Sequence, residues 1–154
     1  MKGGCVYGMN ILFLLKPKQE VAHLVSDCTV RQALEKMRSS GYTAIPIINR
    51  EGEYIATVTE GDFLWLVLGC GTDILKKTEH MPLESVKLRT VNKAVSVNAK
   101  LEDLLLMTMN QNFVPVVDDR NMFIGIITRR DVLQYFYNKL QNEKTAEKKI
   151  SQQA

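Results

Sequence analysis

The stretch "AIPIINREGEYIATVTEGDFL" (44–64) decides the fold, because a second version of it, "FVPVVDDRNMFIGIITRRDVL" (113–133), follows later in the chain. The two stretches align without gaps at a spacing of 113 − 44 = 69 residues. Pro46 falls on Pro115, and the Thr-x-x-Asp of the first stretch falls on that of the second. Self-similarity at a fixed spacing indicates two copies of one structural unit.

The residues before each stretch complete the unit. The helical spacing i, i+3, i+4, i+7 precedes the first stretch, in the apolar residues Val30, Ala33, Leu34 and Met37. Thr29 and Gln32 form a capping box at the start of this helix, and Gly41 is a helix-ending glycine. A short strand is predicted at "VAHLV" before the helix, with two strands and a second helix after it. Each copy therefore has the order β-α-β-β-α.

Each copy is too small to stand alone, since a unit of about 55 residues buries too little surface. Its strands are apolar on both faces, so a second layer must cover them. We expect an α+β fold in which two repeats pack sheet to sheet about a pseudo-two-fold axis. The predicted parts are a flexible N-terminal extension (1–10), a first repeat (11–70), a connector (71–88), a second repeat (89–138) and a charged, poorly ordered C-terminal tail (139–154).

The repeated order, with "GYTAIPIIN" and "TVTEGD" in one copy and "NFVPVVDD" and "GIITRRD" in the other, resembles a tandem pair of CBS domains, the Bateman module. The resemblance covers residues 11–138. It depends on a combination of features: the paired hydrophobic-Pro-hydrophobic strands, the Gly or Ala before the last strand pair, and the Thr-x-x-Asp helix starts. The phrases "VAHLV" and "GYTAIP" also resemble small stand-alone bacterial CBS-pair proteins, some of which bind cyclic di-AMP.

In the CBS family, the clefts between repeats bind adenine nucleotides. The resemblance implies that the first strand and the next strand's start in one copy hold the base. The Thr-x-x-Asp of the other copy then holds the ribose and phosphate. The first site implied here consists of Val21, Ala22, Tyr42, Thr43, Ala44, Ile45 and Pro46 with Thr128, Arg129, Arg130 and Asp131. The second site consists of Asn92, Lys93, Asn112, Phe113, Val114 and Pro115 with Thr59 and Asp62.

The residues of "TRRD" support a nucleotide on chemical grounds. Asp131, at a helix start three residues after Thr128, can accept both hydroxyls of a ribose. The helix N-terminus carries a partial positive charge, and the guanidinium groups of Arg129 and Arg130 match phosphate oxygens. The alternative is purely structural, because Thr-x-x-Asp is also an ordinary capping box.

The two implied sites differ in charge. The first site receives "TRRD", whereas the second receives "TEGD", with Glu60 where Arg129 stands in the other copy. A glutamate repels phosphate, so the second site should be weaker, be empty or hold a neutral group, unless Lys93 offsets the charge.

Each proline and aromatic residue near these sites has two interpretations. A proline in a strand belongs at an edge or bulge, which leaves nearby backbone groups free to bind the edge of an adenine. Tyr42 can stack on a base or belong to the core. Trp65 and the methionines of 107–109 are predicted to pack or to form a dimer surface, and His23 is predicted to be a satisfied or surface histidine.

Composition argues against catalysis. The three cysteines, Cys5, Cys28 and Cys70, are scattered, and only two histidines are present. We therefore predict no catalytic residue, no metal site, no cofactor and no enzyme activity. No apolar run near the start can span a bilayer, and the net charge of +3 is too small for a general nucleic-acid binder. We expect a cytoplasmic protein that binds neither membrane nor nucleic acid.

The leading hypothesis is a regulatory module that senses AMP, ADP, ATP or cyclic di-AMP and signals to an unknown partner protein. CBS pairs commonly dimerise through their helices, and "FLWLVL" and "VLQYFY" fit a homodimer. Two alternatives stay open: a dimerisation scaffold without ligand, and a small nucleotide-processing enzyme.

Overall fold

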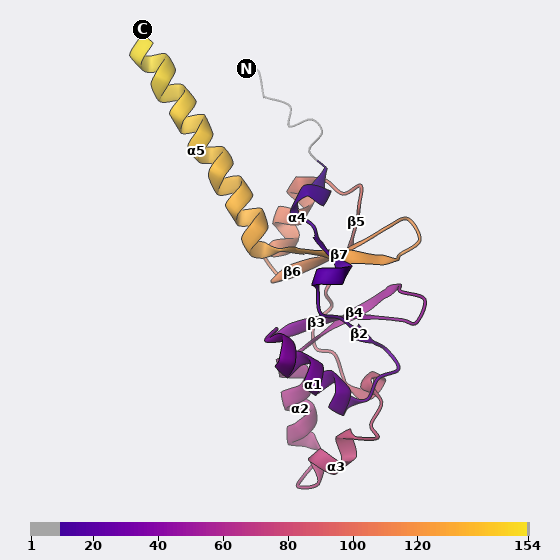
Figure 1. The fold of residues 1–154 in the computed structure, drawn as a ribbon. Helices are drawn as coiled ribbons and strands as arrows, with labels where there is room; N and C mark the ends of the chain where they lie inside the picture. The colour runs from indigo at the N-terminus through magenta and orange to yellow at the C-terminus, as the bar shows by residue number, and fades with distance from the viewer. Residues whose placement is uncertain (1–9, 154) are drawn as a thin grey trace.

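The structure is a computed structural model that describes residues 10–153, so nearly all of the extension predicted to be flexible (1–10) lies outside the described residues. Two halves, each with its own sheet and helices, lie one above the other in Figure 1. The predicted α+β fold of two related repeats is confirmed.

The first repeat has a three-stranded sheet in the order β2-β3-β4. Its strands are β2 (Leu24–Val25), β3 (Ala44–Ile48) and β4 (Tyr54–Thr59). Its helices are α1 (Val30–Ser40), α2 (Glu60–Gly69) and α3 (Ile74–Thr78). Helix α1 begins at the predicted capping box of Thr29 and Gln32, and it ends at Gly41, whose φ of 70° is left-handed as a helix-ending glycine requires.

The second repeat reproduces this arrangement. Its own strands are β5 (Val95–Ser96), β6 (Phe113–Val117) and β7 (Phe123–Thr128), and its helices are α4 (Leu101–Thr108) and α5 (Arg129–Gln153). The pairing of β6 with β7 shifts register between Val116 and Val117, and β3 with β4 shifts between Ile47 and Ile48, 69 residues earlier. The bulge is thus a feature of the repeated unit.

Each repeat is completed by residues that precede the other one. Strand β1 (Lys16–Pro17) pairs antiparallel with β7 of the second repeat, and the buried Ile11 of η1 (Ile11–Leu14) joins the second core. Reciprocally, the 3-10 helix η3 (Leu83–Ser85) packs on the core of the first repeat. Residues 11–17, predicted to belong to the first repeat, therefore lie with the second sheet.

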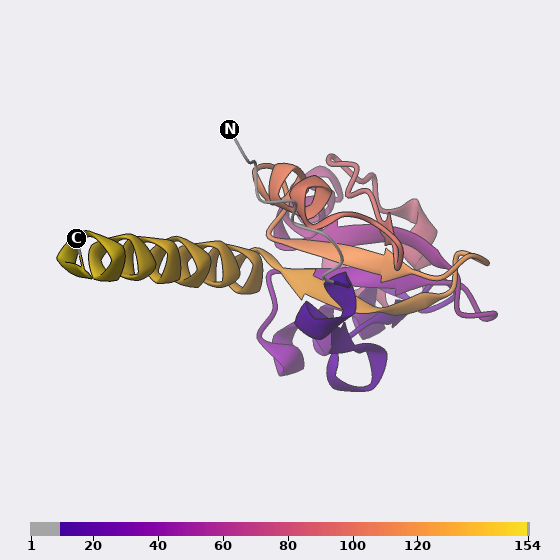
Figure 2. The same cartoon turned by 90° about the horizontal axis from the view of Figure 1, so that it is seen from above.

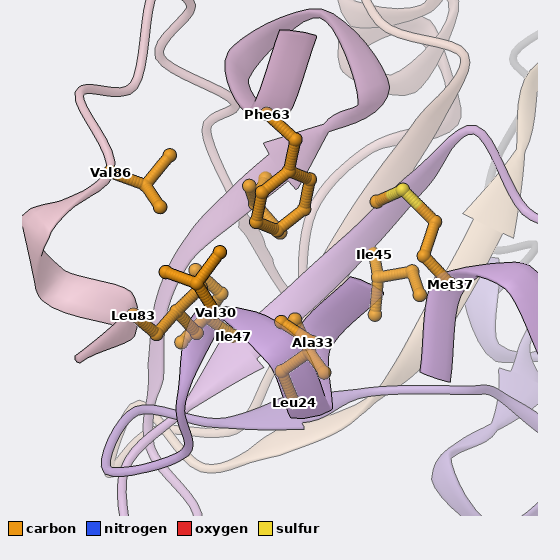
Figure 3. Close-up of a cluster of buried hydrophobic side chains, with 10 residues drawn as sticks. Leu24, Val30, Ala33, Met37, Ile45, Ile47, Phe63, Leu83 and Val86 are labelled. Carbon is orange, nitrogen blue, oxygen red and sulfur yellow. The ribbon is translucent and has the colours of Figure 1, made fainter. Parts of the chain in front are cut away.

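The core of the first repeat fills the space between its sheet and α1 (Figure 3). Val30, Ala33 and Met37 supply the predicted apolar stripe of α1, and each is buried. Leu83 and Val86 from the connector close the cluster, which ties the connector to the first repeat.

The two sheets meet across a third cluster. Val21 and Ile48 of the first half pack against Phe123 and Ile126 of β7. The hairpin turns also pair, since the Phe123 N–H donates to the Gly52 carbonyl at 2.9 Å. The halves thus share an apolar interface, and the cleft between them has fixed walls.

The C-terminal tail corrects one prediction. Residues 139–153 continue α5 as one helix, where poor order was expected, and α5 extends away from the body of the molecule (Figures 1 and 2). The reason is composition: no glycine or proline follows Gly125, and lysine, glutamate and glutamine are good helix formers. The expected solvation is present, because residues 140–151 are exposed.

Candidate functional site

Each Thr-x-x-Asp helix start is bound to the beginning of a strand in its own repeat. The Glu60 N–H donates to the Thr43 carbonyl at 3.0 Å, and the Arg129 N–H donates to the Asn112 carbonyl at 2.9 Å. The starts of β3 and β6 and the N-termini of α2 and α5 therefore gather where the two repeats meet.

A cavity of about 180 Å³ opens at this meeting point. The first repeat contributes Val21, Ala22, Tyr42, Thr43, Ala44 and Pro46, all predicted members of the first site. The second repeat contributes Asn112, Phe113, Ile126 and Thr128. The structure thus brings Thr128 against the predicted base-binding residues, and it adds Asn112 and Phe113, which were predicted for the second site.

The two arginines lie in a groove that adjoins this cavity. The groove, of about 600 Å³, is more open and is lined by Arg129, Arg130, Leu133, Gln134 and Tyr137 together with Asn112 and Thr128. Asn112 and Thr128 line both spaces, so the small cavity and the basic groove lie next to each other. The arrangement can hold a flat apolar group inside and an anionic group outside.

Asp131, a predicted member of the first site, lines neither the cavity nor the groove, although Thr128 and Arg130 beside it do, and its carboxylate is partly available. One carboxylate oxygen accepts a hydrogen bond from the Thr128 hydroxyl and lies 3.7 Å from the Lys16 ammonium. Its side chain is 31% exposed, so the carboxylate can reach a further hydroxyl donor.

Asp62, its counterpart, is committed to the fold. Its side chain is buried and accepts hydrogen bonds from the Thr59 N–H, the Thr59 hydroxyl and the Arg89 N–H, at 2.9, 2.9 and 3.0 Å. Asp62 also lines a different groove, between α2 and the connector, with Trp65 and Arg89. The structural role of a helix cap therefore accounts for Asp62, and a ligand role for it stays a prediction.

Strand alternation removes two predicted residues from the cavity wall. Ile45 and Val114 are fully buried and belong to the separate cores of the two repeats. Neighbouring residues of a strand point to opposite faces, so Ala44 and Pro46 face the cavity while Ile45 cannot. Pro115 is buried in β6.

The prolines lie where one side of the strand is open. Strand β2 pairs only with Ile47 and Ile48 of β3, so Pro46 precedes the paired part, and Pro115 precedes the paired part of β6 in the same way. Proline gives no ladder hydrogen bond, as expected at such a place. The backbone just upstream of β2 and β5 is therefore not held by the sheet.

The sequence did not indicate a role for Gln111, whose side chain binds this free backbone in the second repeat, at Lys93. Its amide oxygen accepts from the Lys93 N–H at 3.1 Å, and its amide nitrogen donates to the Lys93 carbonyl at 3.0 Å. The side chain is 7% exposed. The repeat could have pointed to it: Gln111 lies 69 residues after Tyr42, so a polar residue stands where the first repeat has an aromatic one.

The aromatic side chains resolve into different roles. Tyr42 is 45% exposed and lines the cavity, so it is not a core residue. Trp65 is 54% exposed, with the Arg89 guanidinium 4.8 Å from its ring centroid. His23 is half-buried and satisfied, since Nδ1 lies 3.1 Å from the Val21 carbonyl oxygen.

No cluster of three or more His, Cys, Asp or Glu able to hold a metal occurs among residues 10–153. Burial, followed by the neighbouring Asp27 carboxylate, raises the pKa of the Cys28 thiol, which disfavours the nucleophilic thiolate. Within the same residues, every helix is too short or too polar to cross a membrane.

Two β-α-β-β-α repeats with a ligand-sized cavity between them define a class of tandem-repeat module. The sequence model of the CBS domain family matches residues 15–69 and 85–138, and the chain belongs to the CBS domain family.

Similar proteins and solved structures span much of the chain. Cyclic di-AMP receptor B of Bacillus subtilis is 27% identical over 115 residues, which are 75% of this chain and 78% of that protein. The uncharacterized protein MK0525 of Methanopyrus kandleri is 30% identical over 99 residues, 64% of this chain but about half (49%) of that protein. The crystal structure of CbpB in complex with c-di-AMP superposes with a TM-score of 0.75 and 26% identity, covering 90% of this chain and 91% of that one.

Proposed function

We propose that the protein is a regulatory module that binds an adenine nucleotide between its two repeats and signals its occupancy to another protein. The observation that carries the proposal is that Asn112 and Thr128 line both the small cavity and the arginine-lined groove. A nucleotide has the matching shape: a flat base, a ribose and an anionic end.

The base would occupy the cavity of about 180 Å³. Pro46, Phe113 and Ile126 supply apolar walls, and Tyr42 is placed to cover one face of the ring. The backbone of Ala22 offers an N–H and a carbonyl for the polar edge of the base, since neither is bonded to another described residue.

The ribose and phosphate would lie in the groove. Asp131 has the capacity to accept from a ribose hydroxyl beside Thr128. Arg129 and Arg130 supply charge-assisted hydrogen bonds to phosphate oxygens, at the positive end of the 25-residue helix α5. Their charge favours AMP, ADP, ATP or cyclic di-AMP over adenosine.

Cyclic di-AMP is supported by the relatives named for it, at 27% and 26% identity. A mononucleotide is supported by the size of the cavity, which suits one base. A panel of ligands decides between them. A homodimer fits the exposed apolar side chains of α2 and α5, among them Leu64, Leu68, Leu133 and Tyr137.

The test is thermal unfolding and calorimetry of the purified chain with AMP, ADP, ATP and cyclic di-AMP, with GMP as the control. A ligand present at 100 times its dissociation constant should stabilise the fold by about 2.7 kcal/mol. Absence of any response to all four adenine compounds would leave the ligand-free scaffold as the better account. Turnover of the bound nucleotide, followed by chromatography, would instead support the small enzyme.

A further inference from the structure

The two candidate sites are chemically different at one backbone position. In the second repeat, Gln111 and Lys93 form a closed pair: the side-chain amide accepts from the Lys93 N–H and donates to the Lys93 carbonyl. The same amide nitrogen lies 3.3 Å from the Phe113 carbonyl oxygen, and the Arg129 Nε donates to the Gln111 carbonyl at 3.2 Å. Gln111 is therefore fixed from several sides.

The corresponding position in the first repeat is open. Lys93 corresponds to Ala22 by the 71-residue spacing of the first strands, and Gln111 corresponds to Tyr42 by the 69-residue spacing. Ala22 makes no such pair with any described residue, and it lines the cavity together with Tyr42. The symmetry of the fold thus places a buried amide in one repeat where the other has open space.

The amide of Gln111 resembles the edge of adenine. A carboxamide presents one acceptor beside one donor, and adenine presents a ring nitrogen acceptor beside its amino donor. Both edges satisfy the N–H and carbonyl of a single extended residue with the same polarity. The backbone of Lys93 is thus already paired as a bound base would pair it.

A second hydrogen bond holds the backbone of the same segment, at Asn92, the residue before Lys93. The Tyr54 hydroxyl donates to the Asn92 carbonyl at 2.7 Å. Its counterpart 69 residues on, Phe123, has no hydroxyl with which to hold the first repeat's segment.

We propose that Gln111 is an internal substitute for the adenine base of the second site, so that the natural chain binds one adenine compound per chain, in the first site alone. This inference rests on the proposed nucleotide-binding function and adds the residue that sets its stoichiometry. Glu60 stands at the second site where Arg129 stands at the first. A second site opened by mutation will therefore prefer neutral adenosine to AMP.

The experiment is calorimetric titration of adenosine and AMP into the natural chain, Gln111→Ala and Gln111→Tyr. The tyrosine variant recreates the residue found at position 42 and guards against a folding defect in the alanine variant. Gln141→Ala, on the exposed part of α5, is the matched control. We expect one adenosine per chain for the natural protein and Gln141→Ala, and two for both Gln111 variants. AMP should bind the second site at least tenfold more weakly than adenosine.

Hydrogen exchange at the Lys93 amide provides an independent measurement. The amide should be protected in the natural chain, should exchange at least tenfold faster in Gln111→Ala, and should regain protection when adenosine is added to that variant. Two adenosines bound to the natural chain would overturn the inference while keeping the proposed function. The inference would also be overturned, with the proposed function kept, if each Gln111 variant bound only one adenosine per chain and its Lys93 amide stayed unprotected after adenosine was added. A natural chain that binds no adenine compound overturns both.

Discussion

The carboxylate of Asp62 accepts a hydrogen bond of 3.0 Å from the backbone N–H of Arg89, the residue just after the connector. Asp62 thereby joins the start of α2 to the chain segment that enters the second repeat. Its counterpart Asp131 instead lies 3.7 Å from the Lys16 ammonium, with a side chain that is 31% exposed. Two identical Thr-x-x-Asp starts have thus taken different roles, one structural and one available for binding.

The first prediction separates these roles. Asp62→Ala removes the buried acceptor of the Thr59 and Arg89 N–H groups, which should cost about 1–3 kcal/mol of unfolding free energy. Asp131→Ala should cost less than about 1 kcal/mol, because its ion pair is half-exposed, but should weaken nucleotide binding. Urea denaturation measures the first effect and calorimetry the second. Equal destabilisation by the two substitutions would contradict the division of roles.

The second prediction concerns the arginines of the groove. Arg129→Ala combined with Arg130→Ala removes two donors for phosphate, each hydrogen bond being worth about 1.5–3 kcal/mol. AMP affinity should fall at least about 100-fold, whereas adenosine affinity should change little. Arg38→Ala combined with Arg120→Ala is the control, since it removes the same charge from exposed positions elsewhere. An equal loss for AMP in both double variants would show a general charge effect in place of a site.

Local chemistry explains why much of the fold could be predicted. The stripe of α1, its capping box and Gly41 act within a few residues of one another, so their pattern in the sequence determines their structure. The repeated strand pairs were visible for the same reason. Strand β1 was not, because two residues, Lys16 and Pro17, carry no periodicity and pair with a partner over 100 residues away.

The site divides in the same way. The resemblance to CBS domains predicted residues 42–44 and Thr128 for one site, and the structure places them around one cavity, because these residues belong to the repeated pattern. The predicted site also included Ile45 and Val114, whose side chains point into the cores because neighbouring residues of a strand face opposite sides of the sheet. Gln111 was invisible, since a polar residue between a helix and a strand has many roles and only the folded chain shows it against Lys93.

The third prediction concerns the pairing of strand β1, which precedes the first repeat, with β7 of the second repeat. A Cβ atom at Gly125 would overlap the Lys16 carbonyl oxygen and lie 2.9 Å from Leu15 Cδ1, so β1 can pair with β7 only over a glycine. Gly125→Ala should therefore cost about 1–3 kcal/mol and, by displacing β1, should also weaken nucleotide binding. Gly69→Ala in α2, where nothing lies within 4 Å of the added atom, should be neutral or stabilising. A fully stable Gly125→Ala chain would argue against the β1–β7 pairing.

The fourth prediction concerns Tyr54, whose hydroxyl donates to the Asn92 carbonyl at 2.7 Å and thereby joins the repeats. Burial raises the pKa of Tyr54 above its ordinary value of 10.0, so the neutral phenol is favoured in the folded chain. A raised pKa means that this stabilisation is present below about pH 10 and is lost as the pH rises through the folded-state pKa.

Tyr54→Phe removes both the hydrogen bond and the titration. At pH 7 the variant should be about 1 kcal/mol less stable than the natural chain, because the Asn92 carbonyl loses its donor. Above pH 10 this difference should shrink, since the phenol of the natural chain ionises more readily in the unfolded state than in the folded state. Urea denaturation from pH 7 to pH 11 measures the difference, and Tyr137→Phe, on the exposed face of α5, controls for loss of a surface hydroxyl. A difference between the natural chain and Tyr54→Phe that stays constant over this range would show that the phenol does not bridge the repeats as a buried donor.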